Sequence, residues 1–269
     1  MAFQISPKFD SQLPIDVSHI VTRPGCTLAE LAQQPVCFGR NSVALGELFS
    51  IQQVDDDCDF CWAGQLKNVH GIGFGLAGGK LVVKSDCGRH LGSRMTVGTI
   101  ECFGNAGDFV GTSLRGGSIR IHGSAGDLVG SGFSGDKLGM RNGEILISRD
   151  AGHSIGKRMR RGLIFVGGSA GQRLGESMRA GTIVVVGRVG EGLGNGMKRG
   201  TILVPNDQPQ VRSKNFRFSS LARNPVCRLV GQRLIRLGIK SGESLVADPK
   251  LQLFAGDQTY GGRGEVFFG

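Results

Sequence analysis

Aromatic residues are scarce in this 269-residue chain, which contains one Trp and one Tyr. Long apolar runs are also missing: none approaches the ~20 residues of a membrane-spanning helix, so no membrane association is expected. The opening MAFQISPKFD lacks the apolar stretch of a secretory signal peptide. We therefore expect a cytoplasmic protein in which the seven cysteines are reduced and free.

Proline is limited to 8 residues, whereas glycine is abundant at 46. Without a three-residue period, this composition excludes a collagen-like chain. Disorder is also excluded, because Ile, Leu and Val recur in order through the middle of the sequence. The glycines therefore belong to a folded, repetitive structure.

A 19-residue repeat occupies the middle of the chain. Its anchor glycines are separated by 19, 19, 26, 19, 19 and 19 residues, the long interval being one repeat plus a seven-residue insertion near residues 131–138. Further glycines follow nine and thirteen residues after each of the first six anchors. Aliphatic or small apolar residues stand two and four residues after each anchor. The anchors are Gly79, Gly98, Gly117, Gly143, Gly162, Gly181 and Gly200.

The alternating apolar positions after each anchor predict a short β-strand with one buried face. One repeat holds three short strands and three corners, and it buries its apolar face only when the next repeat stacks on it. Parallel crossovers are almost always right-handed, and the hexapeptide units of left-handed β-helices are absent. The sequence thus predicts an all-β fold, a single-stranded right-handed parallel β-helix of about seven to eight turns. Ile100, Ile119 and Ile145 should lie on adjacent rungs.

Three segments follow from the extent of the repeat. Residues 60–204 are expected to form the β-helix, with residues 1–59 as an N-terminal and residues 205–269 as a C-terminal cap and docking segment. In the first cap, Thr27 and Glu30 have the spacing of a capping box, which predicts a short helix. In the second, a basic and partly apolar stretch is expected to be helical after Pro225.

No catalytic or metal-binding residue is predicted. Gly71, Gly73 and Gly75 have the spacing of part of a dinucleotide-binding fingerprint, but a repeat strand follows where a helix is required, so they are interpreted as corner glycines. Cys58 and Cys61 form a lone CxxC pair without the second pair of a zinc site. Four histidines are interpreted as standing at non-equivalent positions of the repeat, so no row of metal ligands is predicted. They are His70, His90, His122 and His153.

Positive charge is in excess, with a net charge of +10. Basic residues recur one and two residues before the anchors, and stacked repeats would align them on one edge about 5 Å apart. Because stacked cations repel one another, this row favours an anionic cofactor or an acidic partner surface. A merely solvated edge is the alternative, and no nucleic acid is expected because the row has no interleaved aromatic residues. The candidate residues are Arg115, Arg141, Arg160, Arg161, Arg179, Lys198 and Arg199.

The segments GTIECFGNAG (residues 98–107) and GLIFVGGSAG (residues 162–171) resemble the GXGXG repeat domain. That domain ends the large subunits of glutamate synthases and makes up the C component of formylmethanofuran dehydrogenases. The likeness covers residues 68–205 and, more weakly, residues 256–265. The stand-alone length, the N-terminal cap and the insertion are more similar to the C component. The Arg-rich composition is similar to its bacterial version in the formyltransferase/hydrolase complex.

This resemblance implies a setting in one-carbon metabolism. Such a complex passes formyl groups from formyl-tetrahydromethanopterin to a methanofuran-type cofactor with a polyglutamate tail, and hydrolyses them to formate. The implied partners are an amidohydrolase-like subunit with the metal site, a subunit related to the molybdenum/tungsten subunit of the archaeal enzyme, and the formyltransferase. The resemblance implies a non-catalytic scaffold that binds no cofactor tightly by itself. A glutamate-synthase-type domain on a separate chain and an independent anion-binding β-solenoid are the alternatives.

Overall fold

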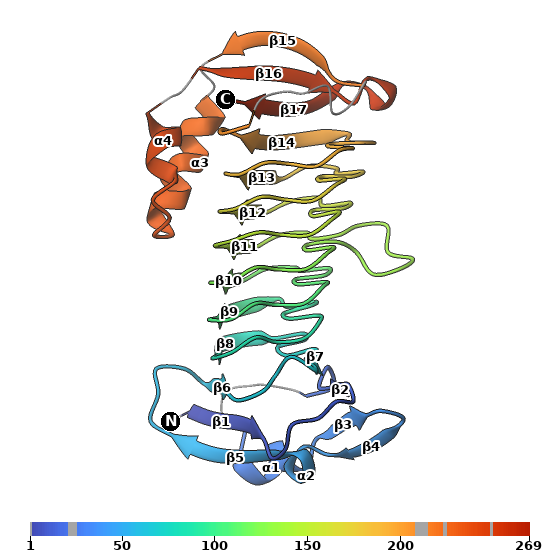
Figure 1. The fold of residues 1–269 in the computed structure, drawn as a ribbon, viewed down its shortest axis with the longest axis vertical. Helices are drawn as coiled ribbons and strands as arrows, with labels where there is room; N and C mark the ends of the chain where they lie inside the picture. Colours follow the sequence, from blue (N-terminus) through green and yellow to red (C-terminus); the bar gives the residue numbers. More distant parts are fainter. Residues whose placement is uncertain (1, 21–25, 208–214, 223–224, 248–249) are drawn as a thin grey trace.

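The structure is a computed structural model that describes residues 2–20, 26–207, 215–222, 225–247 and 250–269. These residues form a tall column of stacked strands, with further strands and short helices at the N-terminal end and a helix pair beside the C-terminal end (Figure 1). The main sheet has 13 strands in the order β15-β16-β17-β14-β13-β12-β11-β10-β9-β8-β6-β1-β5. A smaller sheet has the order β4-β3-β2-β7. The all-β class expected from the repeat is confirmed.

The strands are β1 (Ala2–Pro7), β2 (Ile15–Asp16), β3 (Pro35–Phe38), β4 (Asn41–Ala44), β5 (Phe49–Val54), β6 (Phe60–Trp62), β7 (Val69–His70), β8 (Ala77–Val83), β9 (Val97–Cys102), β10 (Ser118–Ile121), β11 (Glu144–Ile147), β12 (Leu163–Val166), β13 (Thr182–Val185), β14 (Arg199–Val204), β15 (Arg217–Ala222), β16 (Leu251–Gly256) and β17 (Arg263–Phe268). The helices are α1 (Leu28–Ala32), α2 (Leu45–Leu48), α3 (Pro225–Arg236) and α4 (Gly242–Val246), with one 3₁₀ turn, η1 (Gln258–Tyr260).

The strands of the repeat pair in parallel with their neighbours in the sequence. Ile100 of β9 pairs with Ile119 of β10, and Ile119 pairs with Ile145 of β11, as predicted. The same register continues through β12, β13 and β14, each offset by one repeat. Because equivalent apolar side chains lie on top of one another, they form one continuous core along the column.

A second line of contacts joins the residues eight positions after the anchors. There each repeat makes a single parallel bridge to the next: Leu66, Cys87, Ala106, Ala125, Ala151, Ala170 and Val189. The expectation of three short strands per repeat is therefore wrong for the described residues, since each repeat has one strand and one bridging residue. The remainder is turn, because the backbone passes through positive-φ conformations at non-glycine residues such as Phe109 and Ser113.

The regular spacing of glycine reflects close packing at the corners. Gly111 has a φ of +59°, and a Cβ added there would lie 2.5 Å from Cδ1 of Ile145, which belongs to the second repeat after its own. A side chain is therefore excluded by both the backbone conformation and the core. Gly71, Gly73 and Gly75 also have positive φ, and strand β8 follows them, so these three are corner glycines, as interpreted from the sequence.

Polar side chains cap the backbone of the next repeat. Oδ1 of Asp86 accepts a hydrogen bond from the backbone N–H of Asn105 at 2.7 Å, and Oδ1 of Asn105 accepts one from the N–H of Ser124 at 2.8 Å. Oδ1 of Asp150 likewise accepts a hydrogen bond from the backbone N–H of Ser169 at 2.7 Å. These bonds satisfy corner donors that have no strand partner.

The N-terminal segment extends the column with paired strands. Strand β1 pairs with β6 in parallel and with β5 antiparallel. The predicted capping box is confirmed at α1, because Thr27 Oγ1 accepts from Glu30 N at 3.2 Å and Glu30 Oε2 accepts from Thr27 N at 2.8 Å. At the other end, β17 pairs in parallel with β14, and β16 and β15 add antiparallel strands.

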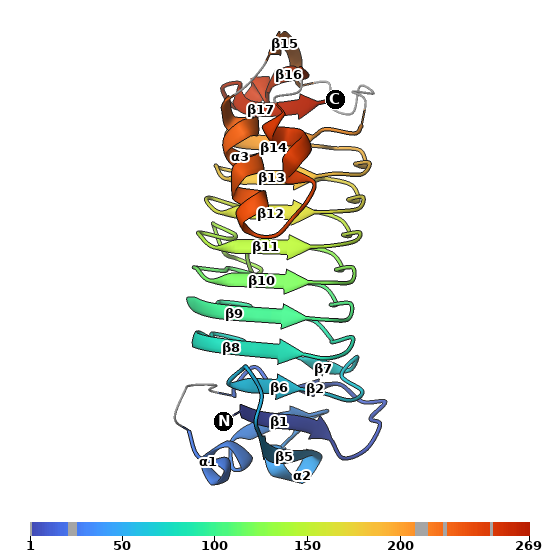
Figure 2. The same cartoon turned by 90° about the vertical axis from the view of Figure 1, so that its left-hand side faces the viewer.

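The predicted helix after Pro225 is confirmed as α3, which packs with α4 on the outward face of the main sheet (Figure 2). Outward-facing Leu146, Phe165 and Val184 form a second buried cluster with Leu234 of α3 and Leu245 of α4. The column is therefore packed on its inner side throughout, and on its outer side beneath the helix pair.

Candidate functional site

The predicted basic row lies along one edge of the column, where the backbone turns back toward the strands. The backbone N–H groups of Arg141, Arg160 and Arg179 donate to carbonyls of the preceding repeat at 2.7–2.8 Å, as does that of Lys198 at 2.8 Å. Arg115 makes the equivalent bond at 2.9 Å. The basic residue of each repeat therefore lies next to that of the preceding repeat along the column.

All seven predicted residues of the row are exposed. Within the part of the chain that the structure describes, none of their side chains forms an ion pair with a carboxylate. The row thus carries unneutralised positive charge at a spacing of about 5 Å. We call these residues the basic edge: Arg115, Arg141, Arg160, Arg161, Arg179, Lys198 and Arg199.

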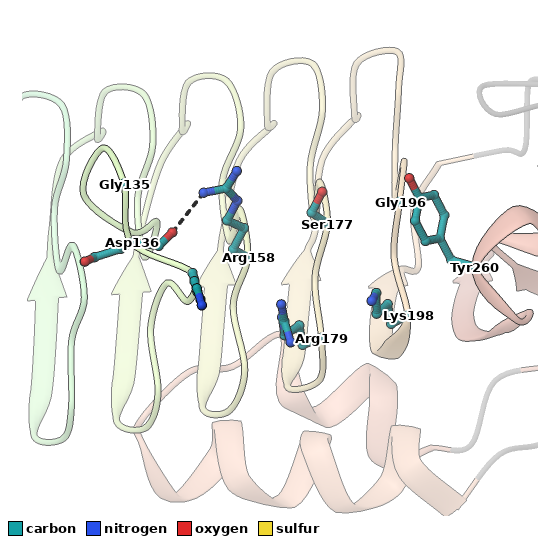
Figure 3. Close-up of a pocket in the computed structure, with 9 residues that line it drawn as sticks. Gly135, Asp136, Arg158, Ser177, Arg179, Gly196, Lys198 and Tyr260 are labelled. Atoms are coloured by element: carbon teal, nitrogen blue, oxygen red, sulfur yellow. Dashed lines mark hydrogen bonds between the residues drawn. The ribbon is translucent and has the colours of Figure 1, made fainter.

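The basic edge borders a pocket of about 290 Å³ (Figure 3). Arg179 and Lys198 of the basic edge line this pocket together with Arg158 and with Lys137 of the insertion. Tyr260 of η1 lines its opposite end. Its remaining lining residues are Gly135, Asp136, Ser177 and Gly196. Four cations and one carboxylate line the pocket, so its electrostatic potential is positive.

The insertion at residues 131–138 is fixed to the column by polar contacts. Ser113 Oγ donates to Asp136 Oδ2 at 2.7 Å, and the guanidinium of Arg158 donates to the Asp136 carbonyl at 2.8 Å. The hydrogen bond from Ser113 lowers the pKa of Asp136, with a smaller contribution from the Phe133 N–H and the charges of Arg94 and Arg141. The carboxylate therefore stays ionised while it anchors the loop.

Aromatic stacking holds the other arm of the insertion. The Phe133 ring lies 5.6 Å from the His90 ring at 13°, and His90 stacks on Phe109 at 4.8 Å. The Arg94 guanidinium lies 4.8 Å from the centroid of Phe133. The loop is thus a fixed wall of the pocket.

Sequence reasoning predicted Arg179 and Lys198 but missed the other two cations and the aromatic residue of the pocket: Arg158, Lys137 and Tyr260. Arg158 stands two residues before Arg160 on the same corner, so a search for cations over the whole corner would have found it. Lys137 lies in the insertion and Tyr260 in the last sheet, outside the repeat, and no periodic signal points to either.

The histidines do not all stand at unlike positions, which corrects the sequence interpretation. His70 Nδ1 accepts from the Arg89 N–H at 3.0 Å, and His153 Nδ1 accepts from the Gln172 N–H at 2.9 Å, each from the residue 19 positions later. The missed signal was the degenerate repeat that precedes the first anchor. These two are corner caps, and a row of metal ligands is still not formed.

Five cysteines form no disulfide bond: Cys37, Cys58, Cys61, Cys87 and Cys102. Cys58, in the segment between β5 and β6, and Cys61 of β6 are buried in one small cluster, and burial raises the pKa of Cys58 to about 11 and also raises that of Cys61. Cys87 and Cys102 lie with their sulfur atoms 3.9 Å apart in the core. Thiols with a raised pKa are poor nucleophiles at neutral pH.

Among the described residues, no group of three or more His, Cys, Asp or Glu side chains is placed to hold a metal ion. No helix among these residues has both the length and the apolar character needed to cross a membrane.

Comparison with known proteins identifies the family. The model of the GXGXG motif matches residues 80–220. No curated protein sequence matches significantly. Among solved structures, a chain of the formyltransferase/hydrolase complex FhcABCD from Methylorubrum extorquens, determined with methylofuran, is similar with a TM-score of 0.88 and 30% identity over 98% of each chain. The chain therefore belongs to the GXGXG family, and its full-length likeness fits the C component of the formyltransferase/hydrolase complex.

Proposed function

We propose that this chain is a non-catalytic scaffold subunit of a cytoplasmic formyltransferase/hydrolase complex. The proposed complex transfers formyl groups from formyl-tetrahydromethanopterin to a methanofuran-type cofactor and hydrolyses them to formate. The observation that carries the proposal is the likeness to a FhcABCD chain over 98% of both chains, which includes both ends as well as the repeat. A shared repeat alone would leave the ends unmatched.

The proposed scaffold is a right-handed parallel β-helix of about seven to eight turns, formed by residues 60–204. Residues 1–59 and 205–269 are its proposed caps and docking segments. In-register pairing from β8 to β14 supports a rigid column, because each repeat is bound to two neighbours along its length. A rigid column holds partner subunits at fixed separations.

A scaffold role is supported by the uses of the polar side chains. His70 and His153 accept backbone hydrogen bonds, His90 is stacked between Phe109 and Phe133, and Asp257 caps η1. These three histidines and Asp257 are thus engaged in holding the fold. The chemistry is proposed to belong to the partners, namely the amidohydrolase-like subunit, the subunit related to the molybdenum/tungsten subunit of the archaeal enzyme, and the formyltransferase.

The basic edge is proposed to meet an acidic surface of a neighbouring subunit. Seven exposed cations without ion pairs in the described part of the chain support this role. Arg suits such a surface because its planar guanidinium binds carboxylates through two parallel hydrogen bonds. A polyglutamate cofactor tail is the second candidate for the same edge, favoured by the open, cation-lined pocket between the insertion and Tyr260.

Co-expression tests this proposal. The chain, carrying an affinity tag, is produced together with the formyltransferase and hydrolase subunits encoded in the same genome, and is purified at low and moderate salt. Recovery of a stable complex with both activities supports the proposal. Recovery of the chain alone, or with glutamate synthase subunits, contradicts it.

A further inference from the structure

The outward face of the main sheet is covered at both ends and open in the middle. Toward the C-terminus, α3 and α4 cover Leu146 and Phe165. Toward the N-terminus, the segment between β5 and β6 covers Val82, which is buried with Cys58. Both covers lie on the same side of the column (Figure 1), and the outward face of β9 and β10 is uncovered between them (Figure 2).

We call the outward-facing residues of these two strands and the residue after each strand the open face. An exposed aromatic ring lies at the end of this face that follows the strands: Phe103 is 53% exposed and stacks on His122 with centroids 4.8 Å apart and planes at 4°. His122 Nε2 lies 2.9 Å from Glu101 Oε1. The Phe103 ring is therefore held face to face against the imidazole of the next rung, and its edge points outward from the sheet. The open face consists of Thr99, Glu101, Phe103, Ser118, Arg120 and His122.

The two borders of the open face differ in charge. On the side of β8, three exposed aspartates, residues 55–57, face Lys80 and Lys84, and two of the aspartates form ion pairs at 3.1 and 3.3 Å. On the side of β11, Arg236 and Lys240 are exposed at the end of α3 and just beyond it. Arg120 of the open face donates to the carbonyl of Leu237 at the same border. Three aspartates against two lysines leave the first border with one net negative charge, whereas the second border is basic.

The width of the open face matches one α-helix. Neighbouring strands are about 4.8 Å apart, so two strands and half the space on either side span about 10 Å. A helix with its side chains is about 10–12 Å in diameter. On the same face of the same sheet, the next rungs are already covered by helices of this chain.

We propose that the open face is the docking site for one α-helix of a partner subunit of the complex. The helix places an apolar side chain on the Phe103 ring. Its acidic residues face the border formed by Arg236 and Lys240, and its basic residues face the aspartates of residues 55–57. This inference rests on the proposed function, since it assigns one contact within the proposed complex, and it is independent of the basic edge.

Photo-crosslinking tests the open face in the assembled complex. p-Benzoylphenylalanine is placed at position 103 and, as a matched control, at Phe218, which is 56% exposed on β15. The expected result is a crosslink from position 103 to a peptide of another subunit that is helical and has acidic and basic residues on opposite sides. The control should not reach that peptide. Phe103→Ala should weaken assembly by about tenfold, because exposed aromatic anchors dominate interfaces.

The outcomes separate this inference from the proposed function. An intact complex without a crosslink from position 103, or with a crosslink only to a second copy of this chain, overturns the docking site and leaves the scaffold role standing. Failure of the unsubstituted chain to assemble overturns both. Unchanged assembly of Phe103→Ala with an unchanged melting temperature also counts against the docking site, because the variant is then folded.

Discussion

At the scale of single residues, His70 and His153 show how the repeat tolerates different side chains at one corner. Both accept a backbone N–H through Nδ1, and Asp127 does the same for His153 N at 2.7 Å. Imidazole and carboxylate groups thus serve as acceptors at this corner, whereas Arg89, at the same position of its own repeat, forms an ion pair with Asp108 instead. An imidazole accepts this hydrogen bond only when Nδ1 carries no proton.

The first prediction concerns His70 and pH. Burial, with a smaller contribution from the charge of Arg89, lowers the pKa of His70 from its usual 6.5. A lowered pKa of a base means that the unfolded chain binds the proton more readily, so the stabilisation is present above pH 6.5 and is lost as pH falls through the folded pKa. The melting temperature should therefore fall from pH 7.5 to pH 5.

Two substitutions isolate this effect. His70→Gln keeps an acceptor that does not titrate, so its melting temperature should depend less on pH than that of the unsubstituted chain. His70→Leu leaves the Arg89 N–H without its acceptor and should cost about 1–3 kcal/mol at neutral pH. An equal pH dependence in all three proteins would show that His70 is not the titrating cap.

The second prediction compares two glycines with positive φ. A methyl group at Gly111 (φ +59°) would meet Ile145 at 2.5 Å, whereas at Gly135 (φ +87°) it would meet nothing within 4 Å. Both Ala variants carry the backbone cost, but only Gly111→Ala also overpacks the core, by about 1–3 kcal/mol. Chemical unfolding of both variants should show this difference. Equal losses would mean that the core relaxes around the added methyl.

Much of the stacking between repeats could be predicted from the sequence, because residues at the same position of successive repeats occupy equivalent places in the column. The 19-residue period alone predicts that Ile100 stacks on Ile119, and the two residues are paired in the structure. The role of His70 could not be reached in the same way, since the repeat that contains it lacks the anchor glycine. Lys137 could not be assigned to the pocket because its position depends on how the insertion folds.

At the scale of elements, the outward position three residues after each anchor decides where the helix pair can pack. This position is Glu101 and Arg120 in β9 and β10, and it becomes Leu146, Phe165 and Val184 in β11, β12 and β13. Apolar side chains on the outer face need a cover, and α3 with α4 provides it. The change from charged to apolar was visible in the sequence. Which segment covers it was not, because many amphipathic helices fit an apolar strip.

The third prediction tests this packing. Phe165→Ala removes a buried ring beneath the helix pair and should cost about 3 kcal/mol. Hydrogen exchange should also become faster in α3 and α4, whereas the inner strands keep their protection. Glu101→Ala, at the same position of an uncovered strand, should cost less than about 1 kcal/mol. Uniformly faster exchange along the whole column would contradict a separate docking of the helix pair.

At the scale of the whole molecule, the column has two faces suited to different contacts. The basic edge is a row of exposed cations, and the open face presents an aromatic ring between charged borders. Long-range charge accelerates association, and buried aromatic contacts slow dissociation. A scaffold with both faces is suited to hold several partners along one rigid axis.

The fourth prediction concerns the basic edge. Replacing Arg160, Arg161 and Arg179 with Ser should weaken complex assembly or cofactor retention, most clearly at moderate salt, since ions screen the remaining charges beyond about 10 Å at 0.1 M. The control replaces three exposed cations outside the edge by Ser, which changes the net charge equally: Arg217, Arg228 and Lys250. If assembly and cofactor retention both match the control at low and moderate salt, the edge is only solvated.

Native mass spectrometry of the complex isolated from the source cells through a tag on this chain tests the central claim most directly. The scaffold account predicts one assembly that contains this 28.5 kDa chain together with hydrolase and formyltransferase subunits. It also predicts that these subunits no longer stay associated when this chain is removed. A single species at 28.5 kDa, with both activities recovered in an assembly that lacks this chain, would contradict it.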